Sequence, residues 1–327
     1  MKALVLEEKH KLSLRDFPIE RQEALGPRDV RIKLHTVGIC GSDVHYYTHG
    51  AIGPFVVREP MILGHEASGV VIEAGKSART LREGDRVAYA LPVPGAYCDE
   101  RVMDAAHAVK LPEAVSDREA AAIMLKGLTA WFLLRRCHRV RRNEQVLLHA
   151  AAGGVGLIAL QWAAALGAKV IAVVGSDEKA ALVAAHGAAE VIVGTRENVV
   201  ERVRAITRKR GVPVVYDGVG KDTFTASLDC LAPLGLMVSF GNASGAVPPI
   251  SPLELTKRGS LFLTRPTLFH YTARASELAR GARELFEVVG SGRVKVRVGR
   301  TYPLENAAEA HRDLEARRTT GSSLLIP

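Results

Sequence analysis

Two short stretches near the amino end gather residue types that can bind a metal. Cys40 lies in VGICGSDVHYYTHG (37–50), and His65 and Glu66 lie in LGHEASG (63–69). Thiolate, imidazole and carboxylate groups all suit zinc, and three protein ligands with one open position describe a catalytic zinc site. Such an ion would polarise an alcohol oxygen and prepare the alcohol to lose hydride. The alternative is that these residues belong to an enzyme that works without a metal.

The adjacency of His65 and Glu66 weakens the metal hypothesis. Neighbouring residues on a strand point to opposite faces, so both side chains reach one ion only where the backbone is irregular. Gly64 would permit such an irregularity; otherwise Glu66 lies outside the ligand set. Taken singly, Cys40 is more often a buried small residue and His65 a hydrogen-bonded loop histidine. Both hypotheses therefore stay open.

A glycine-rich loop, HAAAGGVG, provides the stronger chemical signal. Aligned with the dinucleotide-binding fingerprint it reads Ala151-x-Gly153-x-x-Gly156, between an expected strand at 144–150 and an expected helix at 155–168. Gly153 lets the backbone approach a pyrophosphate, Gly156 lets the helix pack on the strand, and the helix N-terminus attracts the phosphates. The strand before the loop and the helix after it favour a dinucleotide site over a tight turn without a ligand.

The next strand indicates which dinucleotide binds. An NAD site needs an acidic residue at the end of that strand to bind the ribose 2′-hydroxyl. Here the strand ends at Gly175 and Ser176, and Asp177 is expected to cap or begin the following helix. Ser176 and Lys179 could then contact a 2′-phosphate, which favours NADP(H). The alternative for Lys179 is an exposed helical lysine.

The elements around these motifs predict an α/β protein of two domains. A chain of 327 residues suits two domains. The first 120 residues read as short strands with turns, and from about residue 121 strands alternate with helices, which predicts a doubly wound parallel Rossmann sheet. We expect a mainly β catalytic domain at 1–122, completed by 266–327, and a dinucleotide-binding domain at 123–265.

Composition excludes several classes of protein. The four cysteines form no CxxC pair, so neither a disulfide framework nor a four-cysteine zinc lobe is expected. No apolar run approaches about 18 residues and the amino end lacks signal-peptide features, which predicts a cytoplasmic protein without a membrane span. The net charge of +9 could attract nucleic acid, but aromatic residues are few and do not interleave with the arginine clusters, so nucleic-acid binding is not expected.

Two resemblances follow from longer stretches. LKGLTAWFLLRR, EQVLLHAAAGGVGLIALQWAAALGAKVI, LDCLAPLGLMVSFGNASGAV and RRTTGSSLLIP resemble NADPH:quinone oxidoreductases, the zeta-crystallin-like, zinc-free branch of the medium-chain dehydrogenase/reductase superfamily. HTVGICGSDVHYYTHGAIGPFVVREPMILGHEASGVVIEAG is similar to the zinc-dependent xylitol and sorbitol dehydrogenases of the same superfamily. The chain therefore looks like a hybrid with a seam near residue 90, and both parents imply a GroES-like catalytic domain beside the Rossmann domain.

The quinone reductase resemblance implies a set of cofactor contacts. It places Thr129 near the nicotinamide, Lys179 and Arg317 at the 2′-phosphate, and further residues along the pyrophosphate and the nicotinamide half. Those further residues are Ala152, Gly153, Gly154, Val155 and Gly156 at the loop, and Phe240, Asn242 and Arg265 at the nicotinamide. A tyrosine often found near the adenosine is replaced by Gly194, and Arg196 could compensate for it.

The polyol dehydrogenase resemblance implies the zinc ligands Cys40, His65 and Glu66, with Asp43 orienting His65 and Ser42 relaying a proton. It also implies a further glutamate near residue 124, where this chain has Met124.

The substrate residues combine both resemblances. Quinone reductases carry an asparagine at the position of Cys40, which implies that this part of the substrate cleft differs from theirs. Our candidates for residues that line the cleft are Cys40, Ser42, Tyr46 and Arg265. His45 and His49 are expected in a loop, without a role.

The leading hypothesis is an NADPH-dependent reductase of quinones or similar conjugated carbonyls, forming a homodimer through edge strands around GSLFLTRP (259–266). The alternatives are a zinc-dependent polyol or alcohol dehydrogenase, and a cofactor- or RNA-binding protein with little catalysis.

Overall fold

The structure is a computed structural model that describes residues 1–18, 25–52, 55–56, 60–316 and 318–327. The chain forms two compact units: residues 1–126, 272–290 and 296–327 make the first, and residues 127–271 and 291–295 make the second. The first long segment of each unit ends a few residues later than expected, at residue 126 instead of 122 and at residue 271 instead of 265. Among the described residues, no helix combines the length and the apolar character needed to cross a membrane.

The first unit is mainly β. Its largest sheet has the order β10-β8-β7-β3-β18-β17, with β9 also paired to β3. The bounds are β3 (Asp29–Ile39), β7 (Glu66–Ala74), β8 (Arg86–Ala90), β9 (Glu100–Asp104), β10 (Ala108–Lys110), β17 (Val298–Pro303) and β18 (Ser322–Ile326). A smaller sheet joins β2 (Lys11–Asp16), β1 (Lys2–Glu8) and β6 (Met61–Ile62), and β4 (Ala51–Ile52) pairs with β5 (Phe55–Val56). The last segment of the chain belongs to this unit, where β18 pairs with β3.

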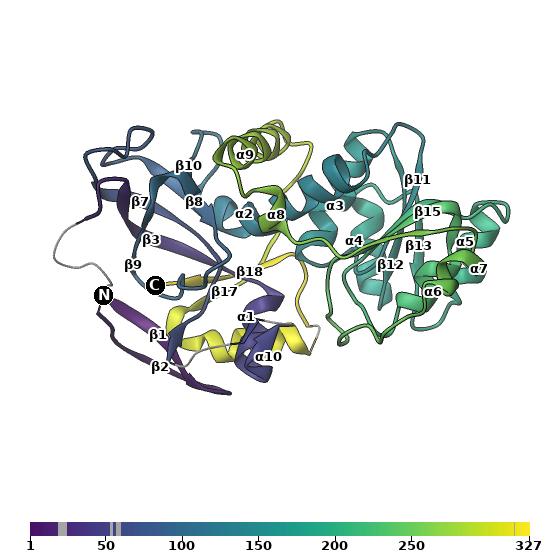
Figure 1. The fold of residues 1–327 in the computed structure, drawn as a ribbon, viewed down its shortest axis with the longest axis horizontal. Coiled ribbons are helices and arrows are strands. Elements are labelled where there is room, and N and C mark those ends of the chain that lie inside the picture. Colours follow the sequence, from purple (N-terminus) through teal and green to yellow (C-terminus); the bar gives the residue numbers. More distant parts are fainter. Residues whose placement is uncertain (19–24, 53–54, 57–59, 317) are drawn as a thin grey trace. The chain divides into compact units, whose positions relative to one another are not determined.

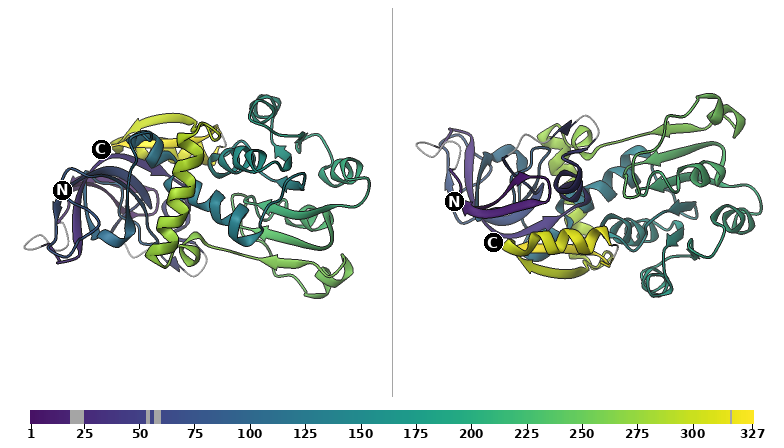
Figure 2. Two further views of the ribbon diagram at one scale, coloured as in Figure 1. Left: turned by 90° about the horizontal axis from the view of Figure 1, so that it is seen from above. Right: turned by 90° about the horizontal axis from the view of Figure 1, so that it is seen from below.

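Helices complete the first unit. They are α1 (Gly41–His49), α9 (Ala275–Gly290), α10 (Ala307–Glu315) and most of α2 (Asp117–Phe132). The late helix α10, drawn in yellow, lies beside the early helix α1, drawn in purple, and Thr48 donates a hydrogen bond to Glu315 across that contact (2.8 Å; Figure 1). The two further views in Figure 2 follow the same chain path from above and below. His45 and His49 lie on α1, so their expected placement in a loop was wrong.

The second unit is built on a six-stranded sheet of order β13-β12-β11-β14-β15-β16, in which every pair is parallel. The bounds are β11 (Gln145–Leu148), β12 (Lys169–Val174), β13 (Glu190–Val193), β14 (Val212–Asp217), β15 (Leu231–Ser239) and β16 (Phe262–Thr264). The central strands β11, β12 and β14 are apolar and mostly buried, as expected where helices cover both faces of a sheet.

The helices of the second unit divide between the two faces of its sheet. α3 (Gly154–Ala165) and α4 (Asp177–Ala185) cover one face, while α5 (Val199–Ile206) and α6 (Phe224–Asp229) cover the other (Figure 1). Leu147 and Ile171 from the sheet share one buried cluster with Val203 from α5 and Leu228 from α6. The strand order reverses between β11 and β14, and dinucleotides bind at such a reversal, outside the carboxyl ends of the strands.

Candidate functional site

The glycine-rich loop has the geometry of a dinucleotide-binding turn. Ala150 takes a positive φ of 51°, the Gly153 amide donates to the Ala150 carbonyl (2.9 Å), and Gly153 is the N-cap of α3. A side chain on Gly156 would overlap the backbone of Ala150 and Ala151, so only glycine lets the helix start this close to the loop. Gly153, Gly154 and Val155 are half-buried at this helix start. The loop therefore presents helix N–H groups and bare backbone, as the sequence predicts.

The end of β12 carries the groups expected to select the cofactor. Ser176 is the N-cap of α4, and its hydroxyl accepts a hydrogen bond from the Lys179 amide (3.3 Å). Asp177 lies in the first turn of α4, as expected, and its carboxylate pairs with Arg196 from the loop after β13 (2.7 Å). Both acidic residues here, Asp177 and Glu178, lie in the first turn of α4, so neither occupies the strand end where an NAD site holds its ribose carboxylate.

The remaining predicted cofactor residues are spread over several elements. Phe240 and Asn242 follow β15 in the second unit, and a side chain on Gly218 would clash with the Phe240 ring. Arg265 directly follows β16 and donates to the Pro266 carbonyl (3.2 Å). Thr129 lies on α2, Ala152 is buried in the loop, and Arg317 lies outside the described residues.

A buried polar network at the strand reversal was missed from the sequence. The Asp217 carboxylate at the end of β14 accepts from the amides of Val219 (2.8 Å) and Gly220 (3.1 Å) and from the Ser227 hydroxyl (2.8 Å). Ser227 in turn lies 3.1 Å from Nε2 of His149, the residue between β11 and the glycine-rich loop. Burial lowers the pKa of His149, so its ring is neutral. The network therefore ties together the ends of β11 and β14, where a cofactor would lie.

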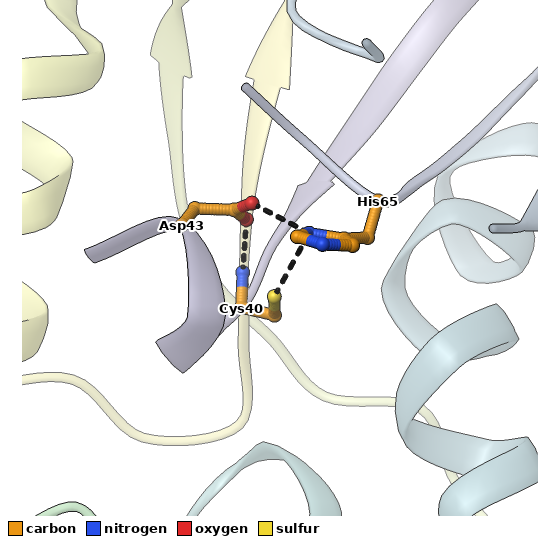
Figure 3. A group of neighbouring side chains, drawn as sticks. All are labelled: Cys40, Asp43 and His65. Atoms are coloured by element: carbon orange, nitrogen blue, oxygen red, sulfur yellow. Dashed lines mark hydrogen bonds and ion pairs between the residues drawn. The ribbon is translucent and has the colours of Figure 1, made fainter. Parts of the chain in front are cut away.

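Cys40, Asp43 and His65 meet in the first unit (Figure 3). Asp43 makes the contacts that organise the group: one oxygen accepts from the Cys40 amide (2.9 Å), and the other lies 2.9 Å from Nδ1 of His65 and accepts from the Gly64 amide (3.1 Å). Cys40 Sγ lies 3.8 Å from the same Nδ1. The expected contact of Asp43 with His65 is confirmed.

The pKa values of all three groups depart from their ordinary values. Burial alone would lower the pKa of His65, but the hydrogen bond and charge of Asp43, together with Cys40, raise it to about 10. Burial opposes ionisation of Asp43 as well, yet hydrogen bonds from His65 and from the Cys40 amide hold the pKa of that carboxyl below its usual range. Burial raises the pKa of Cys40. The resting state is therefore an imidazolium, a carboxylate and a neutral thiol.

Glu66 does not join this group. It is fully buried, and its two carboxylate oxygens are held by the Lys126 ammonium and by the Leu125 amide (2.7 Å), both from α2. Gly64 does take the irregular backbone that the sequence suggests, with a φ of 91°. β7 nevertheless begins at Glu66, so His65 and Glu66 diverge in the way that alternation along a strand requires.

The group as it stands does not fit a catalytic zinc ion. A zinc-bound histidine uses one ring nitrogen for the metal and the other for its carboxylate partner, whereas here Cys40 and Asp43 both approach Nδ1. Both oxygens of Asp43 already accept hydrogen bonds that shape the site, and the Glu66 carboxylate is engaged elsewhere.

Of the other substrate candidates, Tyr46 is buried and stacks on His65, with ring centroids 5.8 Å apart. Ser42 is half-buried in the first turn of α1. Cys40, as the N-cap, and Ser42 and Tyr46, on the helix itself, therefore all belong to α1.

Comparison with known proteins gives two family models and many relatives. The alcohol dehydrogenase GroES-like domain matches residues 26–113, and the zinc-binding dehydrogenase model matches residues 154–291. The expected fold class, a GroES-like unit with a Rossmann unit, is thereby confirmed. A quinone oxidoreductase from Salmonella typhimurium is 51% identical over 301 residues, 91% of each chain.

A solved structure and a polyol-related enzyme extend the comparison. The Escherichia coli quinone oxidoreductase complexed with NADPH matches with a TM-score of 0.95 and 42% identity, covering 100% of both chains. A putative D-xylulose reductase from Agrobacterium fabrum is 36% identical over 354 residues, 98% of this chain and 97% of that protein.

Proposed function

The chain belongs to the quinone oxidoreductases of the medium-chain dehydrogenase/reductase superfamily, and from this premise we propose that it is an NADPH-dependent enzyme that reduces quinones or related conjugated carbonyls. The observation that carries the proposal is the glycine-rich turn at the strand reversal of the second unit, where no residue larger than glycine fits at position 156. The relative complexed with NADPH supports the choice of cofactor.

The preference for NADPH over NADH rests on the turn after β12. β12 ends at Val174 and is followed by Gly175 and Ser176, so no acidic side chain occupies the strand end where a ribose 2′-hydroxyl would be bound, and Asp177 in the next turn pairs with Arg196. Arg196, Lys179 and the Ser176 hydroxyl offer positive charge and a hydrogen-bond donor to a 2′-phosphate instead.

The reaction makes few chemical demands on the protein. Bound NADPH supplies the hydride, and the overall reaction of a quinone, NADPH and a proton gives a hydroquinone and NADP⁺. The loop and α3 bind the pyrophosphate, and the network of Asp217, Ser227 and His149 holds the strand ends on which the cofactor rests. No step requires a metal, in keeping with the group around His65.

The test is NADPH oxidation by purified protein with 1,2-naphthoquinone, before and after treatment with a chelator. We expect quinone-dependent oxidation that survives chelation and is faster with NADPH than with NADH. Oxidation of xylitol or sorbitol that the chelator abolishes would contradict the proposal and favour a zinc-dependent polyol dehydrogenase. The lack of any quinone-dependent turnover would also contradict the proposal.

We further propose a homodimer formed through β16, the edge strand of the parallel sheet. Phe262 and Leu263 on this strand are exposed by 60% and 39%, and an exposed apolar edge of this kind needs a partner. Light scattering after gel filtration tests this, and a monomeric mass would contradict it.

We also propose a cytoplasmic location, which cell fractionation tests.

We propose in addition that the chain has a mixed ancestry, with a seam near residue 90. Separate comparison of residues 1–90 and of residues 91–327 with both families tests this, and the proposal of mixed ancestry fails if both parts are most similar to quinone reductases.

A further inference from the structure

Two histidines on α1 lie on the same face of the helix. His45 and His49 are four residues apart, and residues at this spacing are neighbours on a helix surface. Their ring centroids are 5.7 Å apart, and the ring planes are inclined by 35°. His45 is half-buried and His49 is exposed, so the pair lies at the surface of the first unit. Neither histidine takes part in the proposed reduction of quinones.

The separation of the two rings suits a shared metal ion. Imidazole binds zinc, copper and nickel through one ring nitrogen, at about 2.0–2.1 Å for zinc. Two imidazoles that share one tetrahedral ion therefore have ring centres roughly 5 Å apart. The observed 5.7 Å needs only small side-chain rotations before both rings reach one ion. Because the helix already holds the two side chains together, little conformational entropy is lost on binding.

A carboxylate from another helix lies next to the pair. Thr48, on the same face of α1, donates a hydrogen bond to Oε1 of Glu315 on α10 (2.8 Å; Figure 1). Glu315 is close enough to His45 for the two to interact electrostatically. His49 lies in the last turn of α1, where the helix dipole favours a cation. An ion bound by the two rings would therefore be attracted both by a carboxylate and by the helix end.

The protonation of His45 also favours metal binding. Burial lowers the pKa of His45, the nearby His49 lowers it further, and the Glu315 carboxylate opposes both only in part. A metal ion competes with protons for the ring nitrogens, so a histidine that releases its proton easily is the better ligand at neutral pH. The closeness that makes two protonated rings repel each other is the same closeness that lets two neutral rings bind one ion.

We propose that His45 and His49 form a surface site for a divalent transition-metal ion of the nickel, copper and zinc type. Glu315 supplies the neighbouring negative charge, and water completes the coordination. The site uses none of the residues of the Cys40, Asp43 and His65 group. Among these ions copper binds most tightly, as expected for imidazole ligands without a rigid cage. Nickel is the better probe, because copper also reacts with the thiols of this chain.

The test is calorimetric titration of the full-length protein with Ni²⁺. We expect the wild type to bind about one ion per chain, and His45→Gln and His49→Gln each to weaken binding by at least about tenfold. Because the rings share the ion, the double variant should bind no more weakly than either single variant. His107→Gln is the matched control, since it removes another exposed histidine and should leave the affinity unchanged. Glu315→Gln should weaken binding by roughly three- to fivefold through the lost charge.

Thermal unfolding gives a second readout. Ni²⁺ should raise the unfolding temperature of the wild type but not that of the double variant, because a ligand that binds only the folded protein stabilises it. Wild-type affinity in either single variant, losses that simply add in the double variant, or weaker binding in His107→Gln would overturn the proposal. His49 is exposed, so His49→Gln tests the pair even if His45→Gln folds poorly. These measurements use neither NADPH nor quinone, so their outcome is separate from the assay for quinone reduction.

Discussion

The charge on His65 should make the stability of the protein fall as the solution becomes alkaline. Its pKa is raised to about 10 in the folded state, against an ordinary value of about 6.5 for an unfolded chain. A group with a raised pKa contributes its full stability below the unfolded value and loses it as the pH rises through the folded value. Between pH 7 and pH 9, this one group should therefore reduce the free energy of unfolding by roughly 2–3 kcal/mol.

The assay is urea unfolding at pH 7 and pH 9, with His65→Asn as the matched control. The control is needed because buried thiols also make the protein less stable at alkaline pH. Burial raises the pKa of Cys98, for example, to about 12, so this thiol ionises more readily in the unfolded chain than in the folded protein. The difference between wild type and variant isolates the imidazole. Histidine-selective nuclear magnetic resonance gives the pKa directly. Equal losses of stability in both proteins, or titration of His65 near its ordinary pKa, would refute the reasoning about this group.

Three further outcomes follow from the second unit. Gly156→Val should weaken NADPH binding by at least about tenfold because its side chain overlaps the loop, while Gly290→Ala on α9 should not, since a Cβ there makes only an ordinary contact with Ala114 (3.6 Å); fluorescence titration compares them. Arg196→Ala should raise the KM for NADPH by roughly tenfold and leave that for NADH nearly unchanged, because Asp177 then repels the 2′-phosphate; similar rises for both cofactors would contradict this. Phe262→Asp should convert a dimer to a monomer in light scattering, and an unchanged mass would exclude β16 as the interface.

The second unit could be predicted from the sequence almost element by element. Its strands are short apolar runs, and its loops contain glycine where the chain must turn tightly, so the relevant information is local. The glycine-rich turn and the helix start at Asp177 were predicted for the same reason. His149 was missed because its role depends on Ser227 and Asp217, which are distant in the chain and meet only after the sheet forms.

The first unit shows the limit of such reasoning. α1 contains glycine, histidine and little apolar periodicity, so it was expected to be a loop; the Asp43 side chain stabilises its start by accepting from the Cys40 amide. One hypothesis from the sequence was that Glu66 acts with His65. Its true partner, Lys126, is 60 residues away in the chain, and only the packing of β7 against α2 brings the two together. Residue types indicated what could bind there, but the tertiary contact decides which groups are available.

The place of β18 has a consequence for biosynthesis. This strand lies between β3 and β17 in the sheet of the first unit, although every element of the second unit precedes it in the chain. On the ribosome, the second unit can therefore complete its parallel sheet while the first still exposes an unpaired edge of β3. Exposed edges of this kind favour misassembly with other chains. The interval before residues 322–326 emerge is thus the period in which chaperones would contribute most to the yield of native protein.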